Sequence, residues 1–156
     1  MHFLLCCIGW FDMIEYRKGN LLDVTEGIIV HGCNMCGVMG AGVALAVKQK
    51  YPACFAKYKL CLETCKYSLG ENIMYRVNQN LWICNALTQD DYGGTKRQVN
   101  YTAISHVFRD LVTEGSSPLH FPKIGAGLGG GDWGIIEQII NDCDPDDTVQ
   151  KNCWEL

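Results

Sequence analysis

The chain has 156 residues, a net charge of −4 and 48% hydrophobic residues, which is enough for one domain with a substantial core. Its acidic balance argues against the broad basic face that drives non-specific nucleic-acid binding, so we expect neither DNA nor RNA as the main partner. The ten cysteines lie mostly within apolar segments, which favours reduced, mostly buried thiols over a disulfide scaffold.

The N-terminal segment His2–Phe11 is apolar but has no basic region and no small-residue cleavage site, and it is too short to cross a bilayer. Met13 then opens a clean strand pattern. We therefore expect residues 1–12 to be an extension outside the domain, residues 13–156 to form a single domain, and no membrane attachment.

The alternation of apolar segments predicts strands and helices along the whole chain. In order, we expect strands at 14–17 and 27–31, helices at 42–49 and 52–61, strands at 73–77 and 81–86, a long helix at 98–112, a strand at 119–122, a helix at 133–141 and a closing strand at 149–154. The polar turn at 78–80 predicts that the strands on either side form a hairpin. This alternation is typical of α/β proteins, and we expect a three-layer α/β/α sandwich with a central mixed sheet.

Two glycine-rich loops stand between a strand and a helix, at 37–44 and 124–133. Glycine lets backbone amides approach an anion closely, and the helix after each loop directs its positive end toward the same region. In an open α/β sheet both loops would lie beyond the carboxyl ends of the strands. The pair predicts a clamp for a diphosphate-containing ligand.

Neither loop has the Gly-Lys-Ser/Thr of a phosphate-transferring nucleotide hydrolase. The spacing of Gly37, Gly40 and Gly42 also differs from that of the dinucleotide-binding fingerprint. Both of these nucleotide-binding classes are therefore disfavoured.

Four segments together resemble the macrodomains, which bind ADP-ribose. They are Gly19-Asn-Leu21, Ile29-Val-His-Gly-Cys-Asn34, Gly40-Ala-Gly-Val-Ala44 and Pro122-Lys-Ile-Gly-Ala-Gly-Leu128. The resemblance covers residues 13–156 and is closest to the branch of ADP-ribose-1″-phosphate phosphatases, terminal ADP-ribose glycohydrolases and similar bacteriophage proteins.

The resemblance implies a set of ligand-binding residues. Asn20 stands where many macrodomains carry an adenine-binding aspartate, and it keeps an acceptor without the charge. Asn34 would hold the distal ribose, and the two loops would enclose the diphosphate. The implied set is Gly19, Asn20, Leu21, Asn34, Gly37, Val38, Met39, Gly40, Ala41, Gly42, Val43, Gln89, Gly125, Ala126, Gly127, Leu128 and Gly129.

Two positions depart from the glycohydrolase branch. Where that branch carries a nucleophilic lysine and an assisting aspartate, this chain reads Gln89 and Gly129. An amide forms no Schiff base and glycine offers no carboxylate, so the lysine mechanism is disfavoured. Lys96 and Arg97 follow too far along to replace the lysine.

The remaining catalytic candidates are His31, Asn34 and Asp132, and Asp90 is a further acid–base candidate near the ligand. His31 has an ordinary pKa near neutrality, which suits proton transfer, but it is equally well explained as a core histidine with a backbone partner. Asp132 precedes the helix at Trp133, where capping of that helix is the stronger interpretation. Trp133 is more typical of packing than of an adenine platform. Asn34 would orient the ribose that carries the reacting phosphate.

We therefore predict a hydrolase that removes the phosphate of ADP-ribose-1″-phosphate. The first alternative is an ADP-ribosyl hydrolase acting on modified protein or nucleic acid; the second is a non-catalytic binder of ADP-ribose or a signalling nucleotide. We expect a small ADP-ribose derivative as the partner, no cofactor, no metal, a monomer and, from the likeness to phage proteins, the cytoplasm of an infected bacterium. The pairs Cys33/Cys36 and Cys61/Cys65 are interpreted as buried thiols rather than zinc ligands.

Overall fold

The computed structural model describes residues 13–92 and 96–156. Within them a single six-stranded sheet has the order β1-β6-β5-β2-β4-β3. The strands are β1 (Ile14–Lys18), β2 (Gly27–Asn34), β3 (Asn72–Arg76), β4 (Leu81–Gln89), β5 (Leu119–Phe121) and β6 (Lys151–Glu155). The helices are η1 (Leu21–Asp23), α2 (Gly42–Lys50), α3 (Pro52–Thr64), α4 (Tyr101–Glu114) and α5 (Trp133–Asp142).

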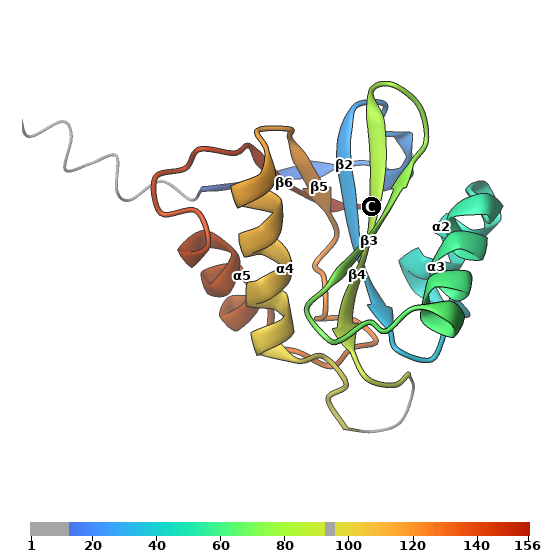
Figure 1. The fold of residues 1–156 in the computed structure, drawn as a ribbon. Coiled ribbons are helices and arrows are strands. Elements are labelled where there is room, and N and C mark those ends of the chain that lie inside the picture. The colour runs from blue at the N-terminus through green and yellow to red at the C-terminus, as the bar shows by residue number, and fades with distance from the viewer. Residues whose placement is uncertain (1–12, 93–95) are drawn as a thin grey trace, which may run out of the picture.

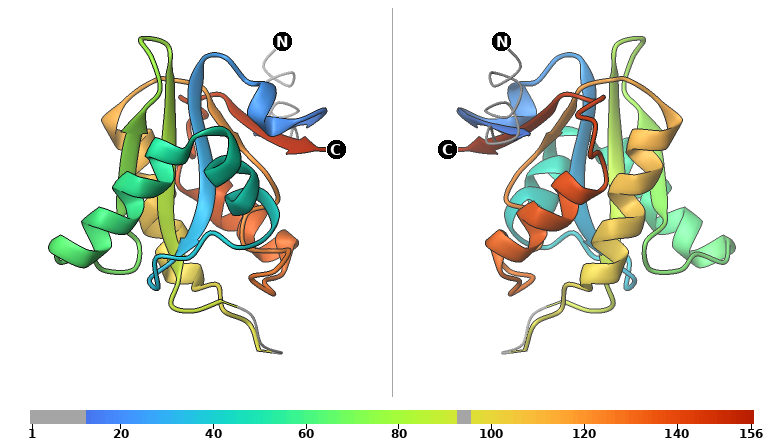
Figure 2. Two further views of the ribbon diagram at one scale, coloured as in Figure 1. Left: turned by 90° about the vertical axis from the view of Figure 1, so that its right-hand side faces the viewer. Right: turned by 90° about the vertical axis from the view of Figure 1, so that its left-hand side faces the viewer.

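The sheet is the middle layer of three. Helices α4 and α5 lie on one face, and α2 and α3 lie on the other (Figure 1, Figure 2). The strand pairs β1/β6, β6/β5, β5/β2 and β2/β4 are parallel, while β3/β4 is the antiparallel hairpin that the turn at 78–80 predicts. The expected three-layer architecture with a mixed sheet is confirmed.

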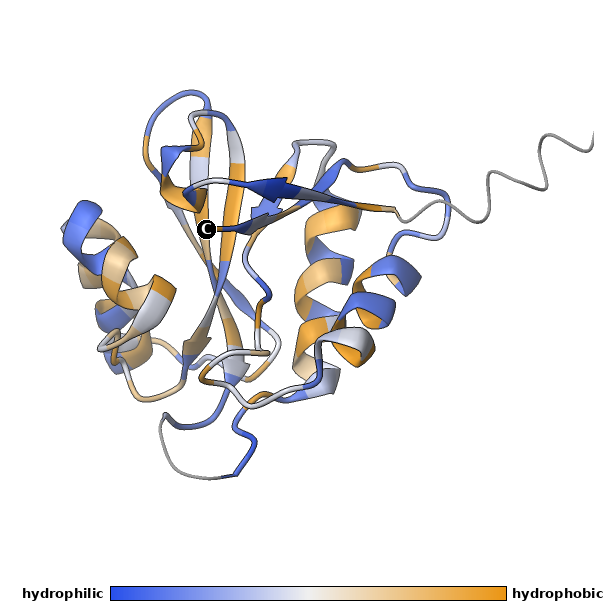
Figure 3. Cartoon of the chain, turned by 180° about the vertical axis from the view of Figure 1, so that it is seen from behind, coloured by the Kyte–Doolittle hydropathy of each residue, from blue (hydrophilic) through white to orange (hydrophobic). Residues whose placement is uncertain are grey.

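The core is divided by the sheet. Beneath α4 and α5, apolar side chains such as Val30, Phe108 and Ile136 form one fully buried cluster. Figure 3 shows the apolar residues of α4 and α5 gathered on the sides that face the sheet, with polar residues outside. Beneath α2 and α3, Ile29 and Ile83 are buried in a second cluster. Because β2 is covered on both faces, its apolar residues are continuous rather than alternating.

Each strand and helix expected from the sequence is present, with shifts at the ends. The largest shifts are of three residues: β2 continues to Asn34, α3 to Thr64 and β4 to Gln89. Helix α4 begins at Tyr101, after its N-cap Asn100, rather than at 98. The short helix η1 was not predicted. The proposed extension at 1–12 lies outside the described residues.

Candidate ligand site

A cavity of about 550 Å³ opens at the carboxyl ends of β2, β4 and β5, between the two glycine-rich loops. In Figure 1 this edge of the sheet is marked by the arrowheads of β2 and β4. Both loops contribute lining residues, as do Gln89 at the end of β4 and Pro122 after β5. The predicted convergence of the two loops on one site at this edge of the sheet is therefore present in the structure.

The first loop is shaped by Asn34, the last residue of β2. Its Oδ1 accepts hydrogen bonds from the amides of Cys36 (3.0 Å) and Val38 (3.2 Å), and its Nδ2 donates to the carbonyl of Val38 (2.8 Å). The hydroxyl of Tyr58, from α3, lies 2.9 Å from the same Oδ1 and 2.7 Å from the carbonyl oxygen of Asn34. Asn34 therefore fixes the loop in addition to lining the cavity.

The amides at the start of α2 are available to a ligand. Ala41 is the N-cap residue and provides no side-chain cap, and Ala41, Gly42, Val43 and Ala44 all line the cavity. An uncapped helix start carries unpaired amides and the positive end of the helix dipole. Gly42 has φ +58°, a conformation that favours glycine at this turn. This end of α2 is suited to an anion.

The second loop is folded on itself by backbone hydrogen bonds. The amide of Gly131 donates to the carbonyl of Gly125 (2.8 Å), and the amides of Gln98 and Val99 donate to Gly129 (2.9 and 3.1 Å). A Cβ at Gly129 would lie 2.8 Å from the carbonyl oxygen of Gly125. The loop therefore has no space for a side chain at the position where the glycohydrolase pattern requires an aspartate.

The helix after the second loop does not offer its N-terminus to the cavity, which corrects our expectation. Oδ1 of Asp132 accepts the amide of Ile135 (3.1 Å) and caps α5, and Asp132 does not line the cavity. Its own amide donates to the hydroxyl of Tyr101 (3.0 Å). The side chain of Asp132 therefore caps α5, which was the stronger of its two interpretations, the other being a catalytic role. Trp133 packs against the core and donates to the hydroxyl of Tyr16 (2.9 Å).

His31 lies at the base of the cavity but is only 1% exposed. Its Nε2 is 2.7 Å from Oδ1 of Asn85 on β4, and the thiol of Cys33 is within 3.8 Å of the ring nitrogens. Desolvation lowers the pKa of His31 to about 4, although the hydrogen bond with Asn85 opposes the shift. The imidazole is therefore neutral at physiological pH, as the core-histidine interpretation requires, although its partner is a side chain rather than a backbone carbonyl.

Lys123 is the only lysine or arginine among the residues that line the cavity in the described part of the chain. Its ammonium lies 2.8 Å from Oε1 of Glu155 on β6, and both side chains are largely exposed. This hydrogen bond and the charge of Glu155 raise the pKa of Lys123. Gln89 donates through Nε2 to the carbonyl of Asp91 (2.8 Å), and Tyr92 covers part of the rim.

Most of the expected ligand residues line the cavity, but six do not. Gly19, Asn20 and Leu21 lie at η1, where the side chain of Asn20 accepts the amide of Leu22 (2.9 Å) and caps the helix. Gly37, Met39 and Ala126 belong to the two loops without lining the cavity. The sequence reasoning did not assign to the site Gly32, Ala44, Pro122, Lys123 and Ile124. All five lie within the segments that carry the resemblance to the macrodomains, and this was the signal that could have assigned them.

The cysteines of the described residues divide into three groups by burial. Cys33, Cys54, Cys84 and Cys153 are buried, and burial raises the pKa of each thiol. Cys61 and Cys143 are partly buried, and Cys36 and Cys65 are exposed, so the expectation of buried thiols in the two pairs holds only for Cys33. No cluster of three or more metal-ligating side chains is present among the described residues.

The sheet order, the cavity at its carboxyl edge and the two loops define a class of α/β ligand-binding domain. The family model described as Macro domain matches residues 30–140, so the chain belongs to the macrodomain family. A solved macrodomain protein from Streptomyces coelicolor superposes with a TM-score of 0.76 at 28% identity, covering 92% of this chain and 99% of that one.

Three curated relatives are similar over most of this chain. An uncharacterized 17.5 kDa protein of Enterobacteria phage T4 is 31% identical, covering 83% of this chain and 88% of the phage protein. An ADP-ribose 1″-phosphate phosphatase of Candida albicans is 26% identical over 85% of this chain and 94% of the enzyme. A DNA ADP-ribosyl glycohydrolase of Mycobacterium tuberculosis is 29% identical over 82% of this chain but only 38% of that enzyme.

No helix in the described residues is both long and apolar enough to traverse a bilayer.

Proposed function

We propose that the cavity binds ADP-ribose and that the protein releases phosphate from ADP-ribose 1″-phosphate. The observation that carries the binding proposal is the uncapped start of α2, which faces the second glycine loop across a cavity of about 550 Å³. A volume of this size is in the range of small-molecule sites, and the unpaired amides suit the diphosphate.

Two observations support phosphate release as the reaction: the residues expected near the distal ribose, and the similarity to a phosphatase. The phosphatase from Candida albicans matches this chain over 94% of its own length, whereas the mycobacterial glycohydrolase carries a large part that this chain does not match. Gln89 supplies no nucleophile, and the turn at Gly129 leaves no space for a carboxylate. These features favour attack by water on phosphorus over a covalent sugar intermediate. The bond between phosphorus and the 1″-oxygen then breaks, a proton from the water passes to that oxygen, and ADP-ribose and inorganic phosphate are released.

In the proposed mechanism, the protein holds the substrate in position and stabilises negative charge on its phosphate. Amides of the two loops stabilise the charge that develops on the phosphoryl oxygens. Asn34 keeps the first loop in place beside the ribose. The side chains of His31 and Asp132 have partners in Asn85 and Ile135, so the proposal does not use either as the proton donor.

Substitution of Ala41 by aspartate tests this proposal. Ala41 is exposed at the N-cap of α2, so a carboxylate there would take up the free amides and repel the diphosphate. The same carboxylate should stabilise the fold by about 1 kcal/mol, because aspartate is a preferred N-cap residue. Calorimetric titration with ADP-ribose should thus show a large loss of affinity in a protein with a higher melting temperature.

The matched control is Ala53→Asp, which places the same residue in the exposed first turn of α3, outside the cavity. It should bind ADP-ribose like the unmodified chain. Phosphate release from ADP-ribose 1″-phosphate is then measured with each protein. Binding without release would leave a non-catalytic binder, and release of ADP-ribose from modified DNA would favour the glycohydrolase alternative. Unchanged binding in Ala41→Asp would contradict the proposed site.

A further inference from the structure

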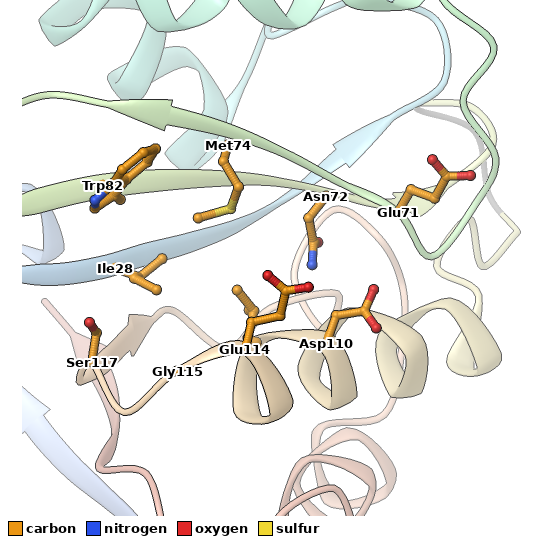
Figure 4. Close-up of a pocket in the computed structure, with 10 residues that line it drawn as sticks. Ile28, Glu71, Asn72, Met74, Trp82, Asp110, Glu114, Gly115 and Ser117 are labelled. Atoms are coloured by element: carbon orange, nitrogen blue, oxygen red, sulfur yellow. The ribbon is translucent and has the colours of Figure 1, made fainter.

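A second cavity of about 540 Å³ lies between the edge strand β3 and the C-terminal half of α4. It is formed by different elements from the glycine-loop site and shares no lining residue with it. Figure 4 shows its side chains entering from both sides, from β2, β3 and β4 above and from α4 below.

One wall of this second cavity is apolar. Trp82 on β4, Met74 on β3 and Ile28 on β2 lie along it, and Leu111 of α4 closes the base. The indole of Trp82 is 36% exposed, which is unusual for a large aromatic side chain on a strand next to the core. The wall offers a flat surface against which an apolar body can stack.

The opposite wall carries two carboxylates, and a third residue with a carboxylate lines the cavity from the strand side. Asp110 and Glu114 are one turn apart on α4 and share a face, whereas the carboxylate of Glu71, just before β3, points away from both in Figure 4. None of the three forms an ion pair within the described parts of the chain. Like charges on one helix face destabilise each other, so a cation between them would be favourable.

One neighbouring group adds to this preference for a positive ligand, and one opposes it. Asn72 donates through Nδ2 to the carbonyl of Val107 (3.3 Å), but its buried Oδ1 accepts no hydrogen bond. The guanidinium of Arg76 lies 5.7 Å from the centre of the Trp82 ring and is held by the carbonyl of Asn78 (3.2 Å). Arg76 therefore adds positive charge at the aromatic wall, while within residues 13–92 and 96–156 no donor reaches the carboxylates of Asp110 and Glu114 or the Asn72 oxygen.

We propose that this cavity binds a small organic cation with a flat apolar body, of the aromatic amine or amidine class. The apolar body stacks on Trp82 and Met74, and the charged end lies beside Asp110 and Glu114. The proposal does not depend on the function of the glycine-loop site.

Benzamidine is a suitable probe, and benzamide is its neutral counterpart of nearly the same shape. Proton–nitrogen correlation spectra of the full chain, titrated with benzamidine, should show saturable shifts at the Trp82 indole, the Asn72 side chain and Gly115. Benzamide should bind much more weakly, because it lacks the charge and two of the donors. Added salt should weaken benzamidine binding.

Asp110→Asn and Glu114→Gln test the carboxylates, and both positions are exposed, so the fold should tolerate the changes. Each should weaken benzamidine binding by roughly fivefold, which corresponds to the loss of one close charge near the surface. Glu63→Gln, on the exposed surface of α3, is the matched control and should have no effect.

Equal binding of benzamide, shifts outside the cavity, unaltered affinity in both carboxylate variants, or no shift at millimolar benzamidine would each overturn the proposal. Shifts confined to the cavity that appear only with an arginine-containing peptide and not with benzamidine would also overturn it, because they would indicate a protein partner instead.

Discussion

The hydroxyl of Tyr58 on α3 lies within hydrogen-bonding distance of both the carbonyl oxygen (2.7 Å) and the side-chain oxygen (2.9 Å) of Asn34. Tyr58 is fully buried, so this contact connects the helical layer to the first glycine loop from below. Burial raises the pKa of Tyr58, which keeps the phenol protonated and able to donate. The loop that borders the cavity is thus supported by a residue that does not touch the cavity.

Replacement of Tyr58 by phenylalanine should loosen this loop without removing the ring from the core. We expect the free energy of unfolding to fall by about 1 kcal/mol, the usual value of one hydrogen bond whose acceptor retains other donors. Affinity for ADP-ribose should fall by about fivefold if a similar free energy is lost on binding. Urea unfolding and calorimetric titration measure the two effects.

Tyr51→Phe is the control, because the Tyr51 hydroxyl forms no hydrogen bond with any residue in the described ranges 13–92 and 96–156. It should change neither quantity. If Tyr58→Phe is destabilised but binds ADP-ribose normally, the Tyr58 contact supports the fold and not the ligand site.

The ion pair between Lys123 and Glu155 should limit the attraction of the cavity for anions. In Glu155→Gln the ammonium of Lys123 loses its carboxylate partner and can turn toward a bound diphosphate. We expect ADP-ribose to bind about threefold more tightly, since exposed ion pairs are weak. Lys123→Gln should bind more weakly and with less dependence on salt.

Lys66→Gln, at an exposed position at the end of the α3 region, separates a local effect from the change in net charge. It should leave the affinity and its salt dependence unchanged. Equal effects of Lys66→Gln and Lys123→Gln would show that only overall charge matters.

Local patterns predicted much of this structure. The strands and helices follow from apolar periodicity and turn residues, and the site follows from glycine loops after two parallel strands. Asp132 precedes a helix, so its capping role could be deduced from position alone. The features that were missed depend on residues distant in the chain. Nothing near His31 indicates that Asn85, 54 positions away, is its partner.

Contacts between distant residues also explain why Lys123, at the edge of the glycine-loop cavity, and the second cavity were not predicted. Lys123 was passed over because its partner Glu155 belongs to another strand. The cavity at Trp82 results from the spacing of α4 above the hairpin, which no local pattern encodes. Exposed Cys36 and Cys65 were placed in the interior because cysteine is so often buried.

Asp144 and Lys151 form a buried ion pair that should account for part of the acid sensitivity of the fold. Oδ2 of Asp144 is 2.6 Å from Nζ of Lys151, and both side chains are almost inaccessible. Asp144 also accepts the amides of Thr148 and Val149. Burial alone would raise the pKa of Asp144. Hydrogen bonds from Lys151, Thr148 and Val149 outweigh this effect and hold the pKa well below its usual value.

The pKa of Asp144 is lower in the folded protein than in the unfolded chain. The stabilisation that Asp144 provides is therefore complete at pH values above its unfolded-state pKa of about 4, and it is lost as the pH falls below that value. Asp144→Asn should lower the free energy of unfolding by about 3 to 5 kcal/mol at neutral pH, because Lys151 is left buried without its main partner. Asp147→Asn is the control. Its carboxylate also contacts Lys151 (3.0 Å) but is 55% exposed, so the loss should be below about 1 kcal/mol. Similar losses in both variants, measured by urea unfolding, would contradict this account.

His31 should affect stability in a different pH range. Its pKa of about 4 in the folded protein lies below the value of about 6.5 in an unfolded chain, so the unfolded state binds more protons between these values. The contribution of His31 is therefore complete above pH 6.5 and is lost as pH falls toward 4. The full difference amounts to about 3 kcal/mol at the usual 1.36 kcal/mol per pKa unit.

The imidazole resonances of the folded protein give a direct test. The signal that disappears in His31→Gln should not titrate above about pH 5, and phosphate release should show no inflection near pH 6.5 attributable to this group. A His31 resonance that titrates near pH 6.5, together with a matching inflection in the rate, would show that the ring reaches solvent and would restore it as the candidate for proton transfer.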